Sequence, residues 1–167
     1  DGRVRILDAD DPQTAISDFQ VEGVSAVKLS TAAFSSDGRF FVVAGQIVLS
    51  GESRGWVYER TAKKSIELHC HIQGHEAGGI RCSSFLPNSP YLATGGTDGA
   101  GLIWNWRPER ADEGPLQAYE VYQLLVDGQT IAHDAPINSL TVSSAGSIAT
   151  ASDDGTAIVW RNPFAKR

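Results

Sequence analysis

The fold is decided by residues 74–106, which read GHEAGGIRCSSFLPNSPYLATGGTDGAGLIWNW. Apolar runs in this stretch end at a turn that carries Pro87 and Pro90, and again at a turn that carries Asp98 and Gly99. Short β-favouring runs separated by Pro, Asn, Gly and Asp predict three strands joined by two tight turns. The same succession of features returns between Ala132 and Trp160. Repetition is therefore the first property of this chain that needs an explanation.

Short apolar runs and turns also make up the rest of the chain. Further extended runs are expected at residues 3–8, 14–21, 27–34, 40–44, 55–59, 65–72 and 118–125. None of them has the 3.6-residue period of a long amphipathic helix. The charged stretch 107–115, RPERADEGP, is expected to be a solvated loop. The sequence therefore predicts an all-β fold.

Composition and charge narrow the classes of function. The chain has 167 residues, of which 41% are hydrophobic and 20% charged, as in a globular domain with a sizeable core. Its formal net charge is -6, so the chain lacks the positive electrostatic field that attracts the phosphate backbone of nucleic acids. No direct nucleic-acid partner is therefore expected. No apolar run approaches the roughly 18 residues of a membrane span, and no signal peptide is visible. We expect an intracellular protein, cytoplasmic or nuclear.

The sulfur-containing residues point to a reducing compartment and to a longer parent protein. Cys70 and Cys82 are too few for a disulfide framework, so we expect two buried free thiols. The chain contains no methionine, which an intact translated protein would normally supply. We therefore expect it to be a piece of something longer.

A set of polar and aromatic residues recurs in register in the two repeats. Asp98 lies six residues before Trp104, and Asp154 lies six before Trp160. A threonine stands four residues before each aspartate, and a histidine stands further back; these are Thr94, Thr150, His75 and His133. This pattern resembles the WD-repeat β-propeller family, whose repeats carry an early Gly-His pair and a closing Trp-Asp pair.

The resemblance implies four-stranded antiparallel blades in an incomplete ring. By similarity, His75, Thr94, Asp98 and Trp104 would form one buried hydrogen-bond network. His133, Thr150, Asp154 and Trp160 would form another. A buried polar group without a partner costs about 1–3 kcal/mol, so such a network must be satisfied throughout. Its expected role is structural rather than catalytic.

Other parts of the chain depart from the family pattern. The closing pair appears as Leu7-Asp8, Tyr58-Glu59, Trp104-Asn105 and Trp160-Arg161. In the copy that ends at Tyr58, Val24 stands at the histidine position and Glu52 at the aspartate position. We expect that blade to lack the network and to be held by the packing of Phe34, Phe40, Val42 and Trp56.

The repeats predict one partial propeller domain over residues 1–167, of about three to three and a half blades. Residues 1–21 would end a preceding blade, 22–72 would form a degenerate blade, 73–125 a clear repeat, and 126–167 a clear repeat that lacks its outer strand. Propellers have four to eight blades, so this number cannot close a ring. Further sequence or another chain is expected to complete it.

Residues that could suggest a metal, phosphate or catalytic site in this chain are better explained by structural roles. His69-Cys70-His71 could suggest zinc, but alternate strand residues face opposite sides and only two ligands would converge. These histidines are expected to be exposed on an outer strand. Gly95 to Gly101 lacks the Lys-Ser/Thr and the following helix of a phosphate-binding loop, so a hairpin turn is expected. No catalytic residue, metal or cofactor is predicted.

The expected function is a non-enzymatic scaffold for protein–protein interactions within a larger protein or complex. The family docks partners on the face formed by the turns between the second and third strands and by the loops that lead to the innermost strand. By that resemblance, the candidate face comprises Glu76, Gly79, Thr97, Ala135 and Asp153. The acidic charge suggests partners with basic segments. The alternative is a structural or regulatory propeller appendage of a larger catalytic protein, such as a kinase, protease or ligase subunit.

Overall fold

The computed structural model describes the chain except for residues 1, 62–64, 77, 108–115, 127–130 and 166–167. The expected loop 107–115 thus lies, apart from Arg107, outside the described residues. The described residues form fourteen strands. They are β1 (Arg3–Leu7), β2 (Ala15–Gln20), β3 (Val27–Phe34), β4 (Phe40–Ile47), β5 (Ser53–Arg60), β6 (Ile66–Ile72), β7 (Ile80–Phe85), β8 (Tyr91–Gly96), β9 (Gly101–Asn105), β10 (Leu116–Gln117), β11 (Tyr119–Leu124), β12 (Ile137–Val142), β13 (Ile148–Ser152) and β14 (Ala157–Trp160).

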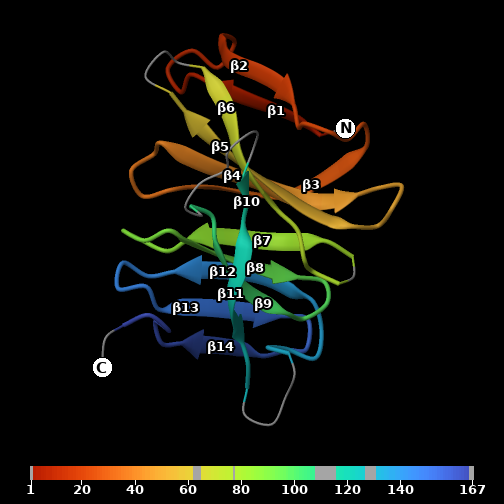
Figure 1. The fold of residues 1–167 in the computed structure, drawn as a ribbon, viewed down its shortest axis with the longest axis vertical. Coiled ribbons are helices and arrows are strands. Elements are labelled where there is room, and N and C mark those ends of the chain that lie inside the picture. The colour runs from red at the N-terminus through yellow and green to blue at the C-terminus, as the bar shows by residue number, and fades with distance from the viewer. Residues whose placement is uncertain (1, 62–64, 77, 108–115, 127–130, 166–167) are drawn as a thin grey trace.

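The strands form four sheets that follow one another along the chain, as the colours of Figure 1 show. The sheet orders are β1-β2, β10-β6-β5-β4-β3, β11-β9-β8-β7 and β12-β13-β14. Within each sheet, strands that directly follow one another in the chain pair antiparallel, as short connections require. This all-β arrangement is the incomplete propeller that the sequence predicts.

Tight turns fix where the strands begin and end. The β8–β9 and β13–β14 turns both read Asp-Gly, and Gly99 and Gly155 have φ angles of 74° and 82°. A side chain at these positions would be strained, because the left-handed region favours glycine. At the other end of the sheets, equivalent backbone hydrogen bonds close the β3–β4 and β7–β8 turns. Ser35 N donates to Phe40 O, and Leu86 N donates to Tyr91 O. This correspondence aligns the sheets residue by residue.

Each junction between neighbouring sheets has its own apolar core. Trp56, Val43 and Val27 fill the junction between the first two sheets. The second and third sheets enclose the largest cluster, which includes Val57, Leu92 and Trp104. A third cluster joins the β7–β9 sheet to β12–β14 through Ile103, Ile137 and Leu140. Burial of apolar surface between sheets is therefore what holds the array together.

Packing in the β3–β6 sheet differs in one respect from the expectation. Phe40, Val42 and Trp56 are buried, whereas Phe34 is 58% exposed. Phe34 pairs with Phe41 at the end of β3, where its ring lies 5.7 Å from that of Phe41. Phe34 is thus a largely exposed residue that contacts Phe41, so of the four residues expected to hold this blade by packing, only Phe40, Val42 and Trp56 are buried.

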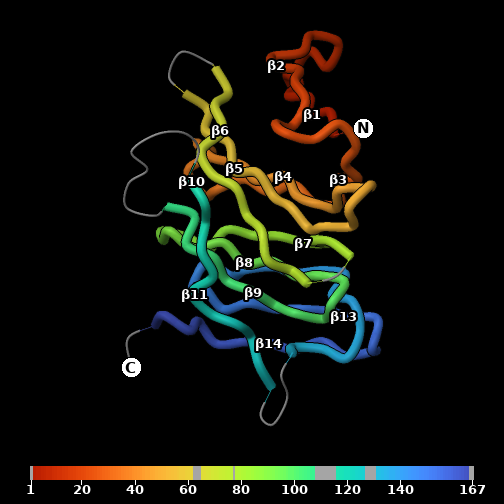
Figure 2. Tube along the Cα trace, turned by 45° about the vertical axis from the view of Figure 1, so that its right-hand side comes forward, coloured from red at the N-terminus to blue at the C-terminus, as the bar shows by residue number. Residues whose placement is uncertain are grey.

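One strand pairing links two sheets. β10 pairs in parallel with β6, through Leu116 with Cys70 and Gln117 with His71. The chain then continues from β10 directly into β11, which pairs antiparallel with β9. Figure 2 shows this segment beside β6 first and beside β9 afterwards. The outer strand of one sheet therefore also covers the edge of the sheet before it.

Candidate functional site

The first network is centred on Thr94 of β8. The Oγ1 atom of Thr94 accepts a hydrogen bond from Trp104 Nε1 at 2.8 Å and lies 2.8 Å from His75 Nε2. His75 Nδ1 lies 3.0 and 3.1 Å from the two carboxylate oxygens of Asp98. Because a carboxylate only accepts, Nδ1 carries a proton; in the neutral imidazole Nε2 then accepts from the Thr94 hydroxyl. These four side chains lie together between β8, β9 and the segment before β7.

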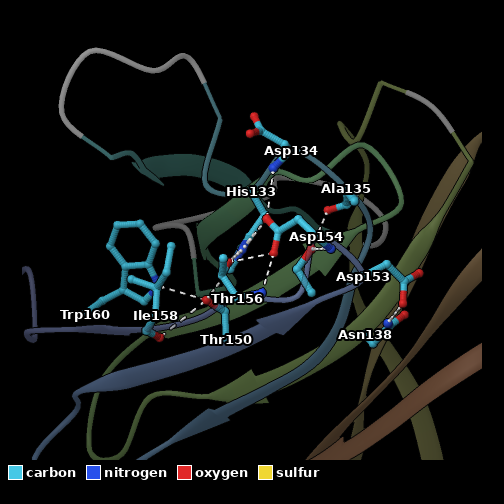
Figure 3. Close-up of polar contacts among 11 residues, drawn as sticks. His133, Asp134, Ala135, Asn138, Thr150, Asp153, Asp154, Thr156, Ile158 and Trp160 are labelled. Atoms are coloured by element: carbon cyan, nitrogen blue, oxygen red, sulfur yellow. Dashed lines mark hydrogen bonds and ion pairs between the residues drawn. The ribbon is translucent and has the colours of Figure 1, made fainter.

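The second network repeats this geometry and is drawn in Figure 3. Trp160 Nε1 donates to Thr150 Oγ1 at 3.0 Å, and His133 Nε2 lies 2.8 Å from the same oxygen. His133 Nδ1 lies 3.0 Å from Asp154 Oδ2. Thr150 and His133 are each 1% exposed. The eight residues thus form two separate clusters of four, in the two repeats.

Hydrogen bonds hold both aspartates in their ionised form. Burial by itself would raise the pKa of Asp98, but donors from His75 and from the backbone of Ala100 and Glu76 outweigh it, so this pKa lies below its usual range. For Asp154, the Thr156 hydroxyl is the main donor that lowers the pKa, although partial burial opposes it. The carboxylates therefore act as fixed acceptors rather than as proton carriers.

Thr156 and Asp134 belong to the second cluster, although the spacing did not single them out. The Thr156 hydroxyl donates to Asp154 Oδ1 at 2.6 Å and lies 3.0 Å from His133 Nδ1. The backbone N–H of Asp134 donates to Asp154 Oδ2 at 3.1 Å. Glu76 N donates to Asp98 Oδ2 in the same way, also at 3.1 Å. The sequence does carry a signal for Asp134, because Glu76 and Asp134 each directly follow the histidine of their cluster.

The residues of the candidate face lie at the ends of strands, with different exposures. Glu76 and Asp153 are exposed, and Thr97 and Ala135 are half-buried. Gly79 is buried, and a side chain there would meet Gln46 Cβ at 2.8 Å. Its carbonyl oxygen accepts from Thr97 N at 3.1 Å. Gly79 is therefore a packing position between sheets and presents no side chain to a partner.

The β3–β6 sheet fills the network position with apolar groups. When the β3–β4 and β7–β8 turns are aligned, Val43 of β4 occupies the position of Thr94 in β8. On the neighbouring strand, Val43 pairs with Trp56, whereas Thr94 pairs with Leu102. Trp56 is fully buried, and its Nε1 donates to the carbonyl of Glu22 at 3.1 Å. An indole at a neighbouring position thus replaces the polar cluster of the other two sheets.

The His69-Cys70-His71 segment lies on β6. His69 and His71 are half-buried rather than exposed. The rings of Phe40 and Trp106 lie 5.2 and 5.7 Å from that of His69. Burial lowers the pKa of both histidines. Cys70 is buried and unpaired, as is Cys82. Within the described part of the chain, no group of three or more His, Cys, Asp or Glu side chains could hold a metal ion.

Gly95 to Gly101 spans the end of β8, a turn and the start of β9, and Gly96 N donates to Ala100 O at 3.1 Å across that turn. The segment is thus a hairpin, as expected. Over the residues that the structure describes, no helix has the length and apolarity that a membrane crossing requires.

Comparison with known proteins identifies the repeats. The model of the family described as WD domain, G-beta repeat, matches residues 66–105 and 127–161. The first match runs from β6 to β9, and the second contains β12 to β14. No curated protein matches the chain. Each match contains one complete His-Thr-Asp-Trp cluster.

Proposed function

Since the chain contains two WD repeats within an incomplete array of propeller-type sheets, we propose that it is a non-enzymatic scaffold for protein–protein interactions. WD repeats are generally scaffolds of this kind. In this proposal the segment belongs to a larger intracellular protein or complex, and proteins or peptides dock on its turns.

The observation that carries the proposal is the equivalent anchoring of two exposed acidic residues. The backbone N–H groups of Glu76 and Asp134 donate to the half-buried aspartates Asp98 and Asp154, each at 3.1 Å. The side chains of Glu76 and Asp134 are exposed. Each network therefore fixes the backbone below a carboxylate that faces solvent, and preorganised groups lose less entropy when a partner binds.

The charge of these positions indicates the chemistry of the partner. The chain has 20 Asp and Glu against 14 Lys and Arg. Exposed carboxylates steer positively charged partners and fix their register more than they add to affinity. We therefore assign the face around Glu76, Thr97, Asp134, Ala135 and Asp153 to a partner with a basic segment.

An uncovered sheet face supports the proposal that further structure completes the ring. In the β7–β9 sheet, Ala93 pairs with Ile103, and both are fully buried beneath β12. At the matching positions of the last sheet, Ala149 pairs with Val159, and Val159 is 77% exposed. Because this face has the same apolar chemistry without a cover, further sequence or another chain is proposed to pack on it.

Affinity capture with charge reversal tests the proposal. The longer parent protein is captured from cell extract as the wild type and with Glu76→Lys and Asp134→Lys combined. Asp10→Lys, in an exposed turn outside the face, is the control. Defined proteins should bind the wild type and the control and be lost from the double variant at unchanged melting temperature. If no protein is recovered reproducibly, or if the double variant retains them all, the face is not a docking surface, and a structural appendage of a catalytic protein becomes the better account.

A further inference from the structure

The turn between β4 and β5, residues 48–52, is longer than the β8–β9 turn. Twelve residues lie between the paired positions Val43 and Trp56, whereas seven lie between the matching positions Thr94 and Leu102. Figure 1 shows the β4–β5 turn on the same side of the array as the β8–β9 turn and extending beyond it. The β3–β6 sheet therefore presents a turn that the WD repeats of this chain lack.

Two aliphatic side chains occupy the tip of this turn. Val48 is 61% exposed, and Leu49, at 86%, is the most exposed large hydrophobic residue among the described ones. Both WD repeats instead carry Asp-Gly in the corresponding turn. Polar residues and glycine are typical of turns, and scattered single apolar residues are normal on a surface. An adjacent aliphatic pair on a projecting turn is therefore a feature that calls for a role.

Main-chain hydrogen bonds hold the tip in one conformation. Ile47 N donates to Glu52 O at 2.8 Å, and Gly51 N donates to Ile47 O at 2.9 Å. Val48 N donates to Ala26 O at 2.9 Å, which ties the turn to the segment before β3. Gly51 takes the left-handed position of the turn, with a φ angle of 75°. The bonds that close the turn thus involve neither aliphatic side chain, and both side chains are left in a fixed, exposed position.

Completion of the ring would not cover this turn. The β3–β6 sheet already has a neighbouring sheet on either side, and an apolar core fills each of the two junctions. Sheets added at either end of the array would pack on β1–β2 or on β12–β14. The exposure of the tip is therefore independent of where the chain begins and ends.

The turn lies beside the acidic face that is assigned above to a basic partner. Ser53 Oγ, at the start of β5, donates to the carbonyl of His75 at 2.9 Å. On the other strand of the hairpin, Gln46 lies against Gly79. Because Glu76 directly follows His75, the aliphatic tip and the exposed carboxylate of Glu76 are neighbours on one surface.

Charge is unevenly distributed over this surface. In the turn itself, the carboxylate of Glu52 is paired with Arg54 at 3.9 Å. Glu76, in contrast, borders a hollow of about 350 Å³ together with the carboxylates of Asp98 and Glu120. Among the described residues, no Lys or Arg lines this hollow. A positively charged group of a partner is therefore attracted to the side of Glu76, next to the aliphatic tip.

We propose that Val48 and Leu49 are the apolar anchor of the acidic face, and that they bind a partner protein segment with an apolar residue close to a Lys or Arg. This inference rests on the proposed scaffold function, because it names a second element that the basic partner must carry. Burial of the exposed aliphatic side chains supplies affinity, and Glu76 fixes the register of the basic residue. Little entropy is lost on binding, because the tip is already held in place.

A protein segment fits this surface better than a lipid surface does. Turns that anchor proteins to membranes combine apolar residues with Lys and Arg, which attract anionic headgroups. Here the nearest charged group outside the turn is the carboxylate of Glu76, and the chain as a whole has a net charge of -6. Anionic headgroups would therefore be repelled, whereas a basic and apolar peptide segment would be attracted.

Selection from a random peptide library tests the proposal. Peptides displayed on phage are selected on the immobilised parent protein, and the recovered peptides are synthesised. Their Kd values are then measured for the wild type and for each variant. The recovered peptides should share an apolar residue next to Lys or Arg, although the library imposes no sequence.

The variants separate the aliphatic tip from other exposed leucines. Leu49→Asp should weaken peptide binding about tenfold or more, because it places a charge in an apolar contact. Leu49→Met should retain binding. Leu7→Asp is the matched control, since Leu7 is also exposed, at the end of β1 and outside the acidic face. Glu76→Lys should weaken binding as well. The high exposure of Leu49 predicts an unchanged melting temperature for Leu49→Asp.

Peptides that carry this pattern and need both Leu49 and Glu76 support the proposal. Recovery of no peptide overturns it, as when another part of the parent protein already covers the tip. Equal binding of every recovered peptide to Leu49→Asp overturns it too, and so does a set of peptides without Lys or Arg. Binding of the parent protein to phosphatidylcholine vesicles that is lost in Leu49→Asp would assign the tip to a lipid surface and would also overturn it.

Failure of this inference can be told apart from failure of the proposed function. If the proteins captured from cell extract are lost on charge reversal of Glu76 and Asp134 but retained by Leu49→Asp, the acidic face docks partners without the turn. The present inference then fails alone. If charge reversal removes no captured protein, the acidic face is not a docking surface, and the proposed function fails with it.

Discussion

Trp104 Nε1 donates to Thr94 Oγ1 at 2.8 Å, from the third strand of its sheet to the second. The pair is almost completely buried, with 2% exposure for Trp104 and 0% for Thr94. Thr94 also contacts His75, so one hydroxyl joins the strands to the segment that enters the sheet. The His, Thr, Asp and Trp residues that recur in the sequence therefore serve to hold the strands and turns together.

Removing the turn carboxylate should lower stability without a specific chemical defect. Asp98→Ala leaves His75 Nδ1 and the N–H of Glu76 without an acceptor. Unpaired buried groups cost about 1–3 kcal/mol, so the free energy of unfolding in urea should fall by that amount. Asp134→Ala, which removes an exposed carboxylate, is the control. An unchanged melting temperature for Asp98→Ala would count against a structural role.

A threonine at the network position of the β3–β6 sheet should destabilise the fold, although the other two sheets carry a threonine there. Val43→Thr puts a hydroxyl at the network position of the β3–β6 sheet, where Val24 replaces the histidine. The buried hydroxyl lacks the partners of the repeats, so unfolding free energy should drop by about 1–3 kcal/mol. The same change at the exposed Val48 should have little effect. A neutral Val43→Thr would show that the site can satisfy a hydroxyl.

Stability should fall on acidification because hydrogen bonds lower the pKa of Asp98 and Asp154. An unfolded aspartate titrates near pH 3.9, so between that value and the lower folded pKa the unfolded chain binds more protons. The stabilisation is therefore complete above about pH 5 and is lost as pH falls through the folded pKa. Urea unfolding at pH 7, 5, 4 and 3 measures this loss. Asp98→Asn should show a shallower decline; an identical decline would assign it to other groups.

Both thiols should be unreactive until the sheets separate. Burial raises the pKa of Cys70 to about 12 and that of Cys82 to about 11, and the thiolate is the reactive form. Modification by a disulfide reagent at pH 8 should be at least about 100-fold slower in the folded chain than in urea. Rapid modification of either residue in buffer would show that its junction between sheets opens readily.

Recurrent residues explain what the sequence could predict. His, Thr, Asp and Trp recur at matching distances, and Asp-Gly turns mark the hairpins, so fold class and strand order follow from local patterns. The exposure of Phe34 could not be predicted, because a one-residue change of register moves a strand residue to the other face. The parallel pairing of Leu116 with Cys70 depends on how two sheets pack. The burial of Gly79 and the half-burial of His69 have the same origin in contacts between sheets.

The most direct test of the account is a double-mutant cycle on Thr94 and Trp104. Thr94→Val removes the shared hydroxyl, Trp104→Phe removes the indole N–H, and urea unfolding gives the free energies of both single variants and the double variant. The account predicts that the effects are coupled by about 0.5–3 kcal/mol, because the two residues share one hydrogen bond within a network. Additivity within about 0.5 kcal/mol would contradict it and show that the network does not hold the repeat together.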